Sequence, residues 1–170
     1  MTSRFRIEAL TAAHDRKRFS CGVEPLDRYL RELASQDIKR RISNCFVALD
    51  ESGVVAGYYT LAATSLPLNE LPADVAKRLP RYPLAPAGLI GRLAVAEGFR
   101  GKKLGGALVM DAALRAARSD PAIFALVVDA KGNAAVAFYA HHGFRRFASR
   151  SDTLFLPLAT ALKALGAIRE

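Results

Sequence analysis

The sequence predicts an α+β fold: a single domain over residues 1–170, built around one mixed sheet. At 170 residues the chain can bury one substantial core but has no room for two ordinary domains joined by a linker. A hydrophobic content of 51% with 24% charged residues is a globular balance. Strand and helix patterns follow as strand, helix, hairpin, irregular insert, strand, loop, helix, strand, helix and strands. This order is typical of α+β proteins and differs from that of a Rossmann domain.

The first elements are a short strand and an amphipathic helix. Residues 5–10 alternate weakly and predict the strand. The helix begins near Glu24 with Pro25 in its first turn, where a missing N–H is tolerated. It ends in the basic run Lys39-Arg40-Arg41. Its predicted apolar face consists of Leu26, Leu30, Leu33, Ala34 and Ile38.

A hairpin and an irregular insert come next. Two β-rich runs, Cys45–Leu49 and Val54–Leu61, flank turn residues at 50–53 and predict the hairpin. Between Pro67 and Pro86 the repeated prolines predict an irregular excursion, with one short helix around residues 73–79. We expect this excursion to lie outside the core.

The second half begins with a strand at residues 88–96, a glycine-rich loop, and a helix from Leu104 to about Arg118. A continuous apolar run at 123–128 predicts a strand buried on both faces. Asn133 is placed to cap a short helix through Tyr139, and Gly143 fits the end of that helix. Two short strands, at 144–148 and 153–158, and a helical tail complete the predicted order.

Composition and cysteine usage exclude several classes. The apolar runs are shorter than the roughly 18 residues of a membrane span, and Met1–Arg6 does not open into a signal peptide. We therefore expect a cytoplasmic protein without membrane association. Cys21 and Cys45 are far apart and lack partners at metal-ligand spacing, which argues against a disulfide framework and a metal site.

The charge balance favours polyanionic partners. Lysine and arginine number 25 against 16 acidic residues, which gives a formal net charge of +9 and a pI near 10.0. Such a field attracts nucleic acid, although many small basic proteins carry it as ordinary solvated surface charge. Charge alone leaves both interpretations open.

The loop Arg100–Gly106 has the composition of an anion site. Amide groups at a helix start point outward and, with the helix dipole, favour phosphate. Glycines allow close backbone approach and three cations lie beside them. The Gly-Lys-Ser/Thr ending of a nucleotide P-loop and the G-x-G-x-x-G spacing are both missing, so ATP and NAD are disfavoured. A plain glycine-rich helix start with solvated lysines remains the alternative for the loop taken alone.

Together with Leu93-Ala94-Val95 before it and Asn133 and Phe138–Phe144 after it, the loop resembles the GNAT acetyltransferase family over residues 88–144. The resemblance implies a mixed, mostly antiparallel central sheet flanked by helices, and acetyl-CoA as co-substrate without a metal. Against the family pattern Arg/Gln-x-x-Gly-x-Gly/Ala, Arg100, Gly101 and Gly105 match and Lys103 replaces the middle glycine. A lysine presents its amide there if its backbone is helical.

The resemblance also implies which residues hold the cofactor. Backbone groups of the strand bind the acetyl and pantetheine parts, and the loop binds the pyrophosphate. The implied cofactor-binding residues are Leu93, Ala94, Val95, Arg100, Gly101, Lys103, Leu104, Gly105, Gly106 and Asn133.

Tyr139 is the predicted catalytic residue. A phenol of pKa about 10 is a suitable acid for a departing thiolate whose conjugate acid has a pKa near 8.5. Taken alone, Tyr139 would more simply be a core tyrosine at a helix end, and the resemblance changes that interpretation. The adjacent His141 and His142 are not assigned a role, since histidines at a helix C-terminus are more often solvated.

A second resemblance concerns the acceptor. The segment Phe19–Leu30, the run Gly57–Leu61 and the run Arg81–Pro83 leading to residues 90–95 are similar to the TacT-type GNAT toxins. That subgroup acetylates the α-amino group of aminoacyl-tRNA and blocks translation. The resemblance implies a ribbon-helix-helix antitoxin, repression of operator DNA by the toxin–antitoxin complex, and a homodimer.

Charge and acidity agree with an aminoacyl-tRNA acceptor. An α-amino group has a pKa around 8, so a useful fraction is neutral without a dedicated base. A basic surface that includes Arg41, Arg81, Arg145 and Arg146 would attract phosphates. The residues expected to contact tRNA are Lys39, Arg40, Lys77, Arg78 and Arg92.

Two other functions remain open from sequence. The first is a GNAT enzyme that acetylates a protein or small-molecule amine. The second is a basic RNA- or DNA-binding module without catalysis, in which the glycine loop only contacts phosphates. The strand Leu93–Val95 and the Phe138-Tyr139 pair count against the second.

Overall fold

A computed structural model describes residues 4–150, 152–164 and 166. Residues 1–3, part of the segment in which the sequence indicates no signal peptide, lie outside the described residues, as do 151, 165 and 167–170. The strands are β1 (Arg6–Ala9), β2 (Asn44–Leu49), β3 (Val55–Pro67), β4 (Leu84–Val95), β5 (Ala125–Asp129), β6 (Arg145–Arg146) and β7 (Thr153–Pro157). The α-helices are α1 (Glu24–Arg28), α2 (Ala34–Lys39), α3 (Ala73–Ala76), α4 (Leu104–Ala117), α5 (Asn133–His141) and α6 (Leu158–Ala164).

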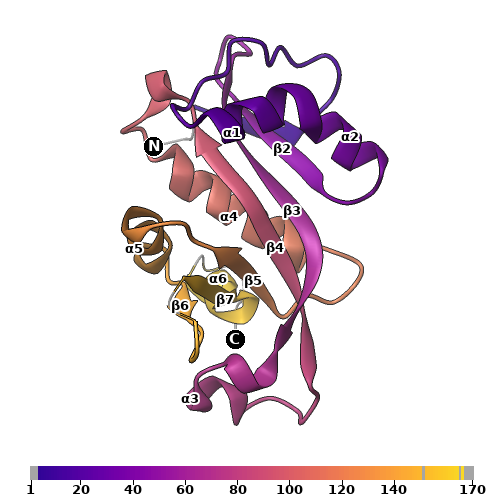
Figure 1. Ribbon diagram of the computed structural model, residues 1–170, viewed down its shortest axis with the longest axis vertical. Coiled ribbons are helices and arrows are strands. Elements are labelled where there is room, and N and C mark those ends of the chain that lie inside the picture. Colours follow the sequence, from indigo (N-terminus) through magenta and orange to yellow (C-terminus); the bar gives the residue numbers. More distant parts are fainter. Residues whose placement is uncertain (1–3, 151, 165, 167–170) are drawn as a thin grey trace. The chain divides into compact units, whose positions relative to one another are not determined.

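The described strands form one seven-stranded sheet in the order β1-β2-β3-β4-β5-β7-β6 (Figure 1). Strands β4 and β5 pair in parallel, from Ala87 opposite Ala125 to Ile90 opposite Val128. The pairs β1–β2, β2–β3, β5–β7 and β6–β7 are antiparallel. The predicted α+β class with a mixed, mostly antiparallel sheet is confirmed.

The chain folds into two compact units. The first comprises Met1–Ala62 and Gly91–Ala112, and the second comprises Ala63–Ile90 and Ala113–Glu170. Strands β3 and β4 and helix α4 each contribute residues to both.

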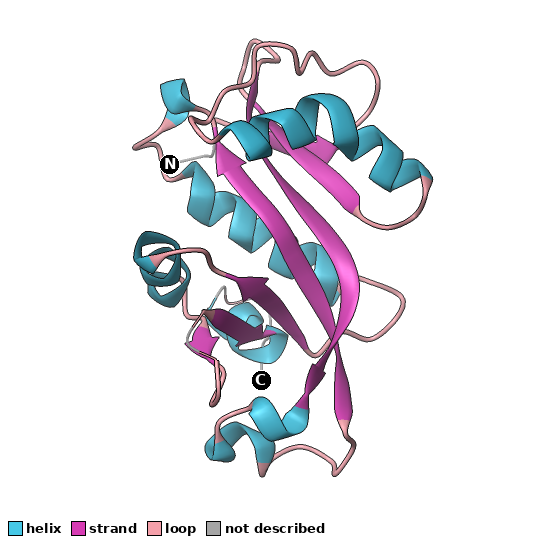
Figure 2. Cartoon of the chain, in the orientation of Figure 1, coloured by secondary structure: helices cyan, strands magenta, loops and turns pink. Residues whose placement is uncertain are grey.

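In the first unit, helices cover both faces of the sheet (Figure 2). On one face, Tyr29 and Leu30 share a buried cluster with Val47 of β2 and Tyr58 of β3. On the other face, Gly57 of β3 lies against Leu104 and Leu108 of α4. Because side chains of a strand alternate between the two faces, the hairpin β2–β3 packs against the helix that carries Tyr29 on one face and against α4 on the other.

The predicted helix at residues 24–39 is continuous but contains a π-helical segment, Tyr29–Leu33, between α1 and α2. The amide of Ala34 donates to the Tyr29 carbonyl rather than to that of Leu30. This widening adds one residue to the turn and shifts the apolar face. Leu33, predicted to face the core, is consequently 37% exposed, whereas Tyr29 is buried.

Arg16 satisfies the carbonyl that the π-helix releases. Its Nη1 donates to the Leu30 carbonyl at 3.1 Å and to Ser35 Oγ at 3.0 Å. We expect Arg16→Ala to lower the free energy of unfolding by about 1.5–3 kcal/mol, the range for a hydrogen bond to a charged group. The matched control is Arg28→Ala on the same helix. It breaks only the exposed 2.9 Å pair with Glu32, worth about 0.3–0.5 kcal/mol.

Urea unfolding of the two variants tests this assignment. Equal losses of stability in Arg16→Ala and Arg28→Ala would contradict it.

The second unit has its own core, and the proline-rich segment contributes to it. Leu66 and Leu71 lie in a buried cluster with Val127 of β5 and Phe155 of β7, and Leu68, Val75, Ala76 and Leu79 pack against it. The expectation that residues 67–86 lie outside the core was therefore wrong. Leu68, Leu71, Val75 and Leu79 recur three or four residues apart, but Pro72 among them interrupts the pattern from which a core-facing segment would be predicted.

The start of α5 in the second unit also differs from prediction. Gly132, with φ of 89°, occupies the N-cap of α5, so Asn133 is its first helical residue and not its cap. The end is as predicted: Gly143 has φ of 92°, and the Phe144 amide donates to the Tyr139 carbonyl at 3.1 Å. Strand β5 is buried at Ala125–Val128, as its apolar run predicted.

In the described part of the chain, no helix is both long and apolar enough to cross a bilayer.

Candidate functional site

The predicted anion loop connects two elements of the first unit. A 3₁₀ turn, Glu97–Phe99, follows β4, and α4 begins at Leu104. Among the described residues, the first amide of α4 with a backbone acceptor is that of Ala107, which donates to the Lys103 carbonyl at 3.3 Å. The amides of Leu104, Gly105 and Gly106 precede it and point out of the helix start, as helix geometry requires. Because α4 is 14 residues long, its dipole favours an anion at this end.

Lys103 adopts a left-handed backbone, with φ of 61°. The condition under which a lysine would present its amide here, a helical backbone, is therefore not met, and glycine, the residue of the family pattern, adopts this conformation without strain. Gly101 is also left-handed, with φ of 78°, and a Cβ atom on it would meet nothing within 4 Å. The chain thus turns at Gly101 and again at Lys103, directly before the outward amides at the start of α4, and Lys102 Nζ lies 5.4 Å from the centre of the Phe99 ring. This donor set suits a pyrophosphate.

Replacing Lys103 by glycine is expected to stabilise the protein. The left-handed conformation costs an ordinary residue about 1–2 kcal/mol, and glycine's extra loss of entropy offsets about 0.5–1 kcal/mol of the gain. The free energy of unfolding of Lys103→Gly should therefore rise by up to about 1 kcal/mol. Lys102→Gly, at a neighbouring residue without positive φ, should lower it, and a higher stability of that control would contradict the explanation.

The strand before the loop holds the other predicted cofactor residues of the first unit. Leu93 and Val95 are half-buried on β4, beyond the segment that pairs with β5, and Ala94 is buried. Gly57 permits this packing, because a Cβ atom there would lie 2.9 Å from the Ala94 carbonyl oxygen. The same Cβ would lie 3.2 Å from Leu104 Cδ2. Glycine at position 57 therefore sets how closely β3, β4 and the start of α4 approach.

Arg92 lies on the same strand and stacks on an aromatic ring. Its guanidinium carbon is 3.6 Å from the centre of the Tyr29 ring, and its amide donates a hydrogen bond to Thr60 Oγ1 at 3.0 Å. The Tyr29 hydroxyl in turn donates to Asp37 Oδ2 at 2.7 Å. Burial, followed by the Asp37 hydrogen bond, raises the pKa of Tyr29 well above its usual value. Arg92 is thus a half-buried cation held by cation–π contact rather than a mobile surface charge.

The predicted catalytic residue lies in the second unit. Tyr139 is on α5 and is 9% exposed, with its ring edge-to-face against Phe138 and Phe144. Its hydroxyl has no hydrogen-bond partner among the described residues and is not among the buried atoms lacking one, so it reaches solvent. Burial raises the pKa of Tyr139 to about 12. The phenol is therefore protonated throughout the neutral range and can donate a proton.

The two cysteines are buried free thiols. Burial raises the pKa of the Cys45 thiol to about 12 and raises that of Cys21 as well, so both stay in the unreactive thiol form at neutral pH. His142, beside Tyr139 in sequence, has its pKa lowered by burial and by His141. Among the residues that the structure describes, no cluster of histidine, cysteine and acidic side chains could hold a metal ion.

The cations expected to contact tRNA fall into two groups. Lys39 and Arg40 are exposed at the end of α2, where the helix dipole favours cations. Lys77 and Arg78 are exposed just after α3. Arg145, named as part of the basic surface, is instead paired with Asp74 through two hydrogen bonds of 3.0 Å. Its charge is therefore largely compensated within the second unit.

Sequence reasoning missed a contact between the N-terminal segment and the anion loop. The Arg100 guanidinium donates to the Cys21 carbonyl, from 79 residues away in the chain. The Glu97 amide donates to the Ser20 carbonyl at 2.9 Å. The Phe19–Leu30 segment was interpreted only as an acceptor signature, and no pattern in the sequence indicates its contact with a residue 79 positions away.

Comparison with known proteins gives concordant matches. Residues 41–146 match the acetyltransferase (GNAT) domain model. A tRNA-acetylating toxin of Mycobacterium tuberculosis (strain ATCC 25618 / H37Rv) is 35% identical over 151 residues, 88% of each chain. A probable toxin TacT of Sinorhizobium fredii (strain NBRC 101917 / NGR234) is 28% identical over 163 residues, 90% of each chain.

Solved structures agree in fold. A tyrosine-to-phenylalanine mutant of KacT has a TM-score of 0.85 at 27% identity, covering 95% of this chain and 99% of that chain. AtaT complexed with acetyl-methionyl-tRNAfMet has a TM-score of 0.84 at 28% identity, covering 95% and 97%. A mutant AtaT bound to acetyl-CoA and the C-terminus of the antitoxin AtaR has a TM-score of 0.79 at 25% identity, covering 96% and 99%.

Proposed function

The chain belongs to the GNAT acetyltransferase family, and we propose that it is a toxin that uses acetyl-CoA to acetylate the α-amino group of aminoacyl-tRNA and so blocks translation. The observation that carries the proposal is the 35% identity, over 88% of both chains, to a tRNA-acetylating toxin. A structural neighbour, AtaT, is solved with acetyl-methionyl-tRNAfMet. The outward amides at the start of α4 support the choice of an anionic co-substrate.

The chain's own groups suit each step of acetyl transfer. Bound acetyl-CoA supplies an acetyl group activated as a thioester. The amides of Leu104–Gly106 and the cations of the loop would hold the pyrophosphate, and backbone groups of Leu93 and Val95 would orient the acetyl group. As the acceptor nitrogen forms the new amide bond, the carbon–sulfur bond breaks, and the Tyr139 hydroxyl donates a proton to the sulfur. The amine loses its own proton to solvent, and solvent returns a proton to the Tyr139 phenolate. Asn133 contributes a further cofactor contact.

The acceptor surface is proposed from charge. Lys39 and Arg40 on the first unit and Lys77 and Arg78 on the second are exposed cations suited to tRNA phosphates. Arg92, held over Tyr29 on the strand that carries Leu93, is the cation suited to the end of the acceptor nearest the acetyl group.

We extend the proposal to the biological context. The chain acts in the cytoplasm as a single GNAT domain over residues 1–170 and forms a homodimer. A ribbon-helix-helix antitoxin neutralises it, and the complex represses its operator DNA. Among the neighbours, a complex of AtaT and AtaR and a complex of KacT and KacA are each solved with DNA.

The test is transfer of radiolabelled acetyl groups from acetyl-CoA to bulk aminoacyl-tRNA, with deacylated tRNA, free amines and a protein mixture as parallel acceptors. Label is expected on aminoacyl-tRNA and not on deacylated tRNA. Label found only on free amines or protein would replace the proposal with an ordinary GNAT acetyltransferase. Failure of the protein to bind acetyl-CoA in calorimetry would favour a non-catalytic nucleic-acid-binding module.

The pH dependence should reflect the acceptor and not Tyr139. The required form of Tyr139 is the phenol, and its pKa of about 12 keeps that form dominant across the neutral range. The required form of the α-amino group is neutral, with a pKa of about 8. We expect kcat/KM to rise with pH up to about 8 and then to level off through pH 9. A fall between pH 8 and 9 in short assays would contradict the role of a buried phenol.

A further inference from the structure

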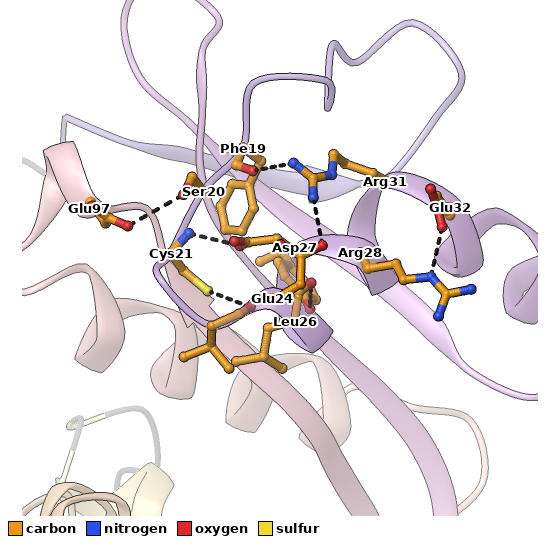
Figure 3. Close-up of polar contacts among 12 residues, drawn as sticks. Phe19, Ser20, Cys21, Glu24, Leu26, Asp27, Arg28, Arg31, Glu32 and Glu97 are labelled. Atoms are coloured by element: carbon orange, nitrogen blue, oxygen red, sulfur yellow. Dashed lines mark hydrogen bonds and ion pairs between the residues drawn. The ribbon is translucent and has the colours of Figure 1, made fainter.

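Asp27 is a buried acidic residue that the proposed chemistry does not use. It is 4% exposed on α1, among apolar neighbours of the first core cluster. A buried carboxylate is unfavourable unless hydrogen bonds compensate it. Its Oδ1 accepts the Cys21 amide at 2.8 Å, and its own amide donates to the Val23 carbonyl at 3.1 Å (Figure 3). Asp27 therefore fixes the turn that enters α1.

The other side of this turn contacts the start of the anion loop. The Cys21 carbonyl accepts a hydrogen bond from Arg100 Nη2. Cys21 therefore donates its N–H to Asp27 and accepts from Arg100 at its C=O, so its backbone connects the two side chains. Ser20 Oγ donates to Glu97 Oε1 at 3.4 Å, and Figure 3 shows these two side chains facing each other. A Cβ atom on Gly22 would lie 3.1 Å from Glu97 Oε1 and 3.2 Å from Arg100 Nη2. The turn and the loop are thus in direct contact.

Arg100 is the first residue of the loop whose amides face outward at α4. Its Nη2 is engaged by a backbone carbonyl, so this end of the loop is held by the turn. The other end is held where Leu104 and Leu108 meet Gly57. Between these two points lie the left-handed residues Gly101 and Lys103. A loop fixed at both ends keeps its amides in the geometry that an anion requires, which lowers the entropy lost on binding.

We infer that Asp27 is a positioning residue for the acetyl-CoA site, acting through the Cys21 peptide groups on Arg100 and the loop that follows it. The inference rests on the proposed function, since it assumes that the loop holds the pyrophosphate of coenzyme A. It assigns the Phe19–Leu30 segment a task in donor binding, in addition to its resemblance to acceptor-specific enzymes.

The experiment compares two donors. Acetyl-CoA carries the pyrophosphate, whereas acetyl-pantetheine lacks it. For Asp27→Ala we expect the affinity for CoA, measured by calorimetry, to fall about tenfold. This is the change in affinity that corresponds to losing one hydrogen bond that holds the loop in its binding conformation. The kcat/KM for acetyl-CoA should fall by the same factor, while that for acetyl-pantetheine stays within about twofold of wild type. Asp27→Asn keeps an oxygen acceptor for the Cys21 amide and should restore CoA binding. Asp37→Ala, on the same helix but bonded to Tyr29, should leave the ratio of the two donors unchanged.

A glycine pair keeps the test decisive should Asp27→Ala fail to fold. Gly22 and Gly53 have similar φ values, 89° and 82°, but a Cβ atom meets Glu97 and Arg100 only at Gly22, and nothing at Gly53. Alanine at either position should lower the Tm comparably, because the backbone strain is alike. Only Gly22→Ala should weaken CoA binding selectively.

The outcomes separate the two proposals. Wild type that does not bind CoA would overturn the proposed function. The positioning role would be overturned if the wild-type protein bound CoA but Asp27→Ala lowered kcat/KM equally for acetyl-CoA and acetyl-pantetheine. It would also be overturned if Gly22→Ala did not weaken CoA binding selectively. Asp27 would then be a structural residue only.

Discussion

Replacing Tyr139 by phenylalanine is expected to lower kcat for acetyl transfer by a factor on the order of 10²–10⁴, the usual contribution of a positioned acid. Only the hydroxyl is removed, and that hydroxyl reaches solvent without a partner in the described chain. The ring and its edge-to-face contacts with Phe138 and Phe144 remain. The free energy of unfolding should therefore change by less than about 0.5 kcal/mol, as for other substitutions that leave packing intact.

The measurement is single-turnover transfer to aminoacyl-tRNA under saturating acetyl-CoA, with growth after induction as a second readout. Wild type should arrest growth and Tyr139→Phe should not. Tyr82→Phe is the matched control, since Tyr82 is 69% exposed in the same unit and should leave kcat unchanged. A Tyr139→Phe enzyme that retains more than half of the wild-type rate would remove Tyr139 from the chemistry.

Replacing Gly57 by alanine is expected to damage both stability and cofactor binding. The added Cβ would lie 2.9 Å from the Ala94 carbonyl oxygen and within 3.3 Å of carbon atoms of Leu104 and Leu108. The carbonyl belongs to the backbone, so the strand or the helix must move. Overpacking of this kind costs about 1–3 kcal/mol. Because Leu104 is the first residue of α4, its displacement also moves the outward amides, and we expect about tenfold weaker binding of CoA.

Gly98→Ala is the matched control for this substitution. A Cβ atom on Gly98 meets nothing within 4 Å, and Gly98 does not have positive φ. Urea unfolding and calorimetric titration with CoA should give values close to wild type for Gly98→Ala and reduced values for Gly57→Ala. If Gly57→Ala bound CoA with wild-type affinity, Gly57 would have no part in setting the position of α4.

Local patterns were sufficient for most elements of the fold. The hairpin, the buried strand β5 and the helix α4 were predictable because their periodicity reflects burial on one or both faces. The π-helical segment was not, since one inserted residue leaves the apolar spacing nearly helical while moving Leu33 outward. The conformation of Lys103 was also not predictable, because only the packing of the loop at both ends explains a left-handed lysine.

In the candidate site, too, some features could be predicted from the sequence and others could not. The anion loop could be predicted from glycines and cations at a helix start, whereas the strand Leu93–Val95 and Tyr139 were assigned from the resemblance to the GNAT family, and their roles stay predictions. The contacts of Cys21 and Asp27 with each other are local, but the contact of Cys21 with Arg100 spans 79 residues and has no sequence pattern. The pairing of Arg145 with Asp74, 71 residues away, was invisible for the same reason.

The π-helical segment also determines how many residues can separate Tyr29 and Asp37 if their side chains are to meet. Tyr29 and Asp37 are eight residues apart and hydrogen-bonded. In an uninterrupted α-helix, residues seven apart share a face, and those eight apart differ by about 80° around the axis. The extra residue of the π-helical turn brings Asp37 back to the same face of the helix as Tyr29. A deletion of one residue here would rotate Asp37 away from Tyr29, and the ring on which Arg92 stacks would lose its hydrogen bond. Insertions and deletions in this helix should consequently be rarer among functional variants than substitutions at the same positions.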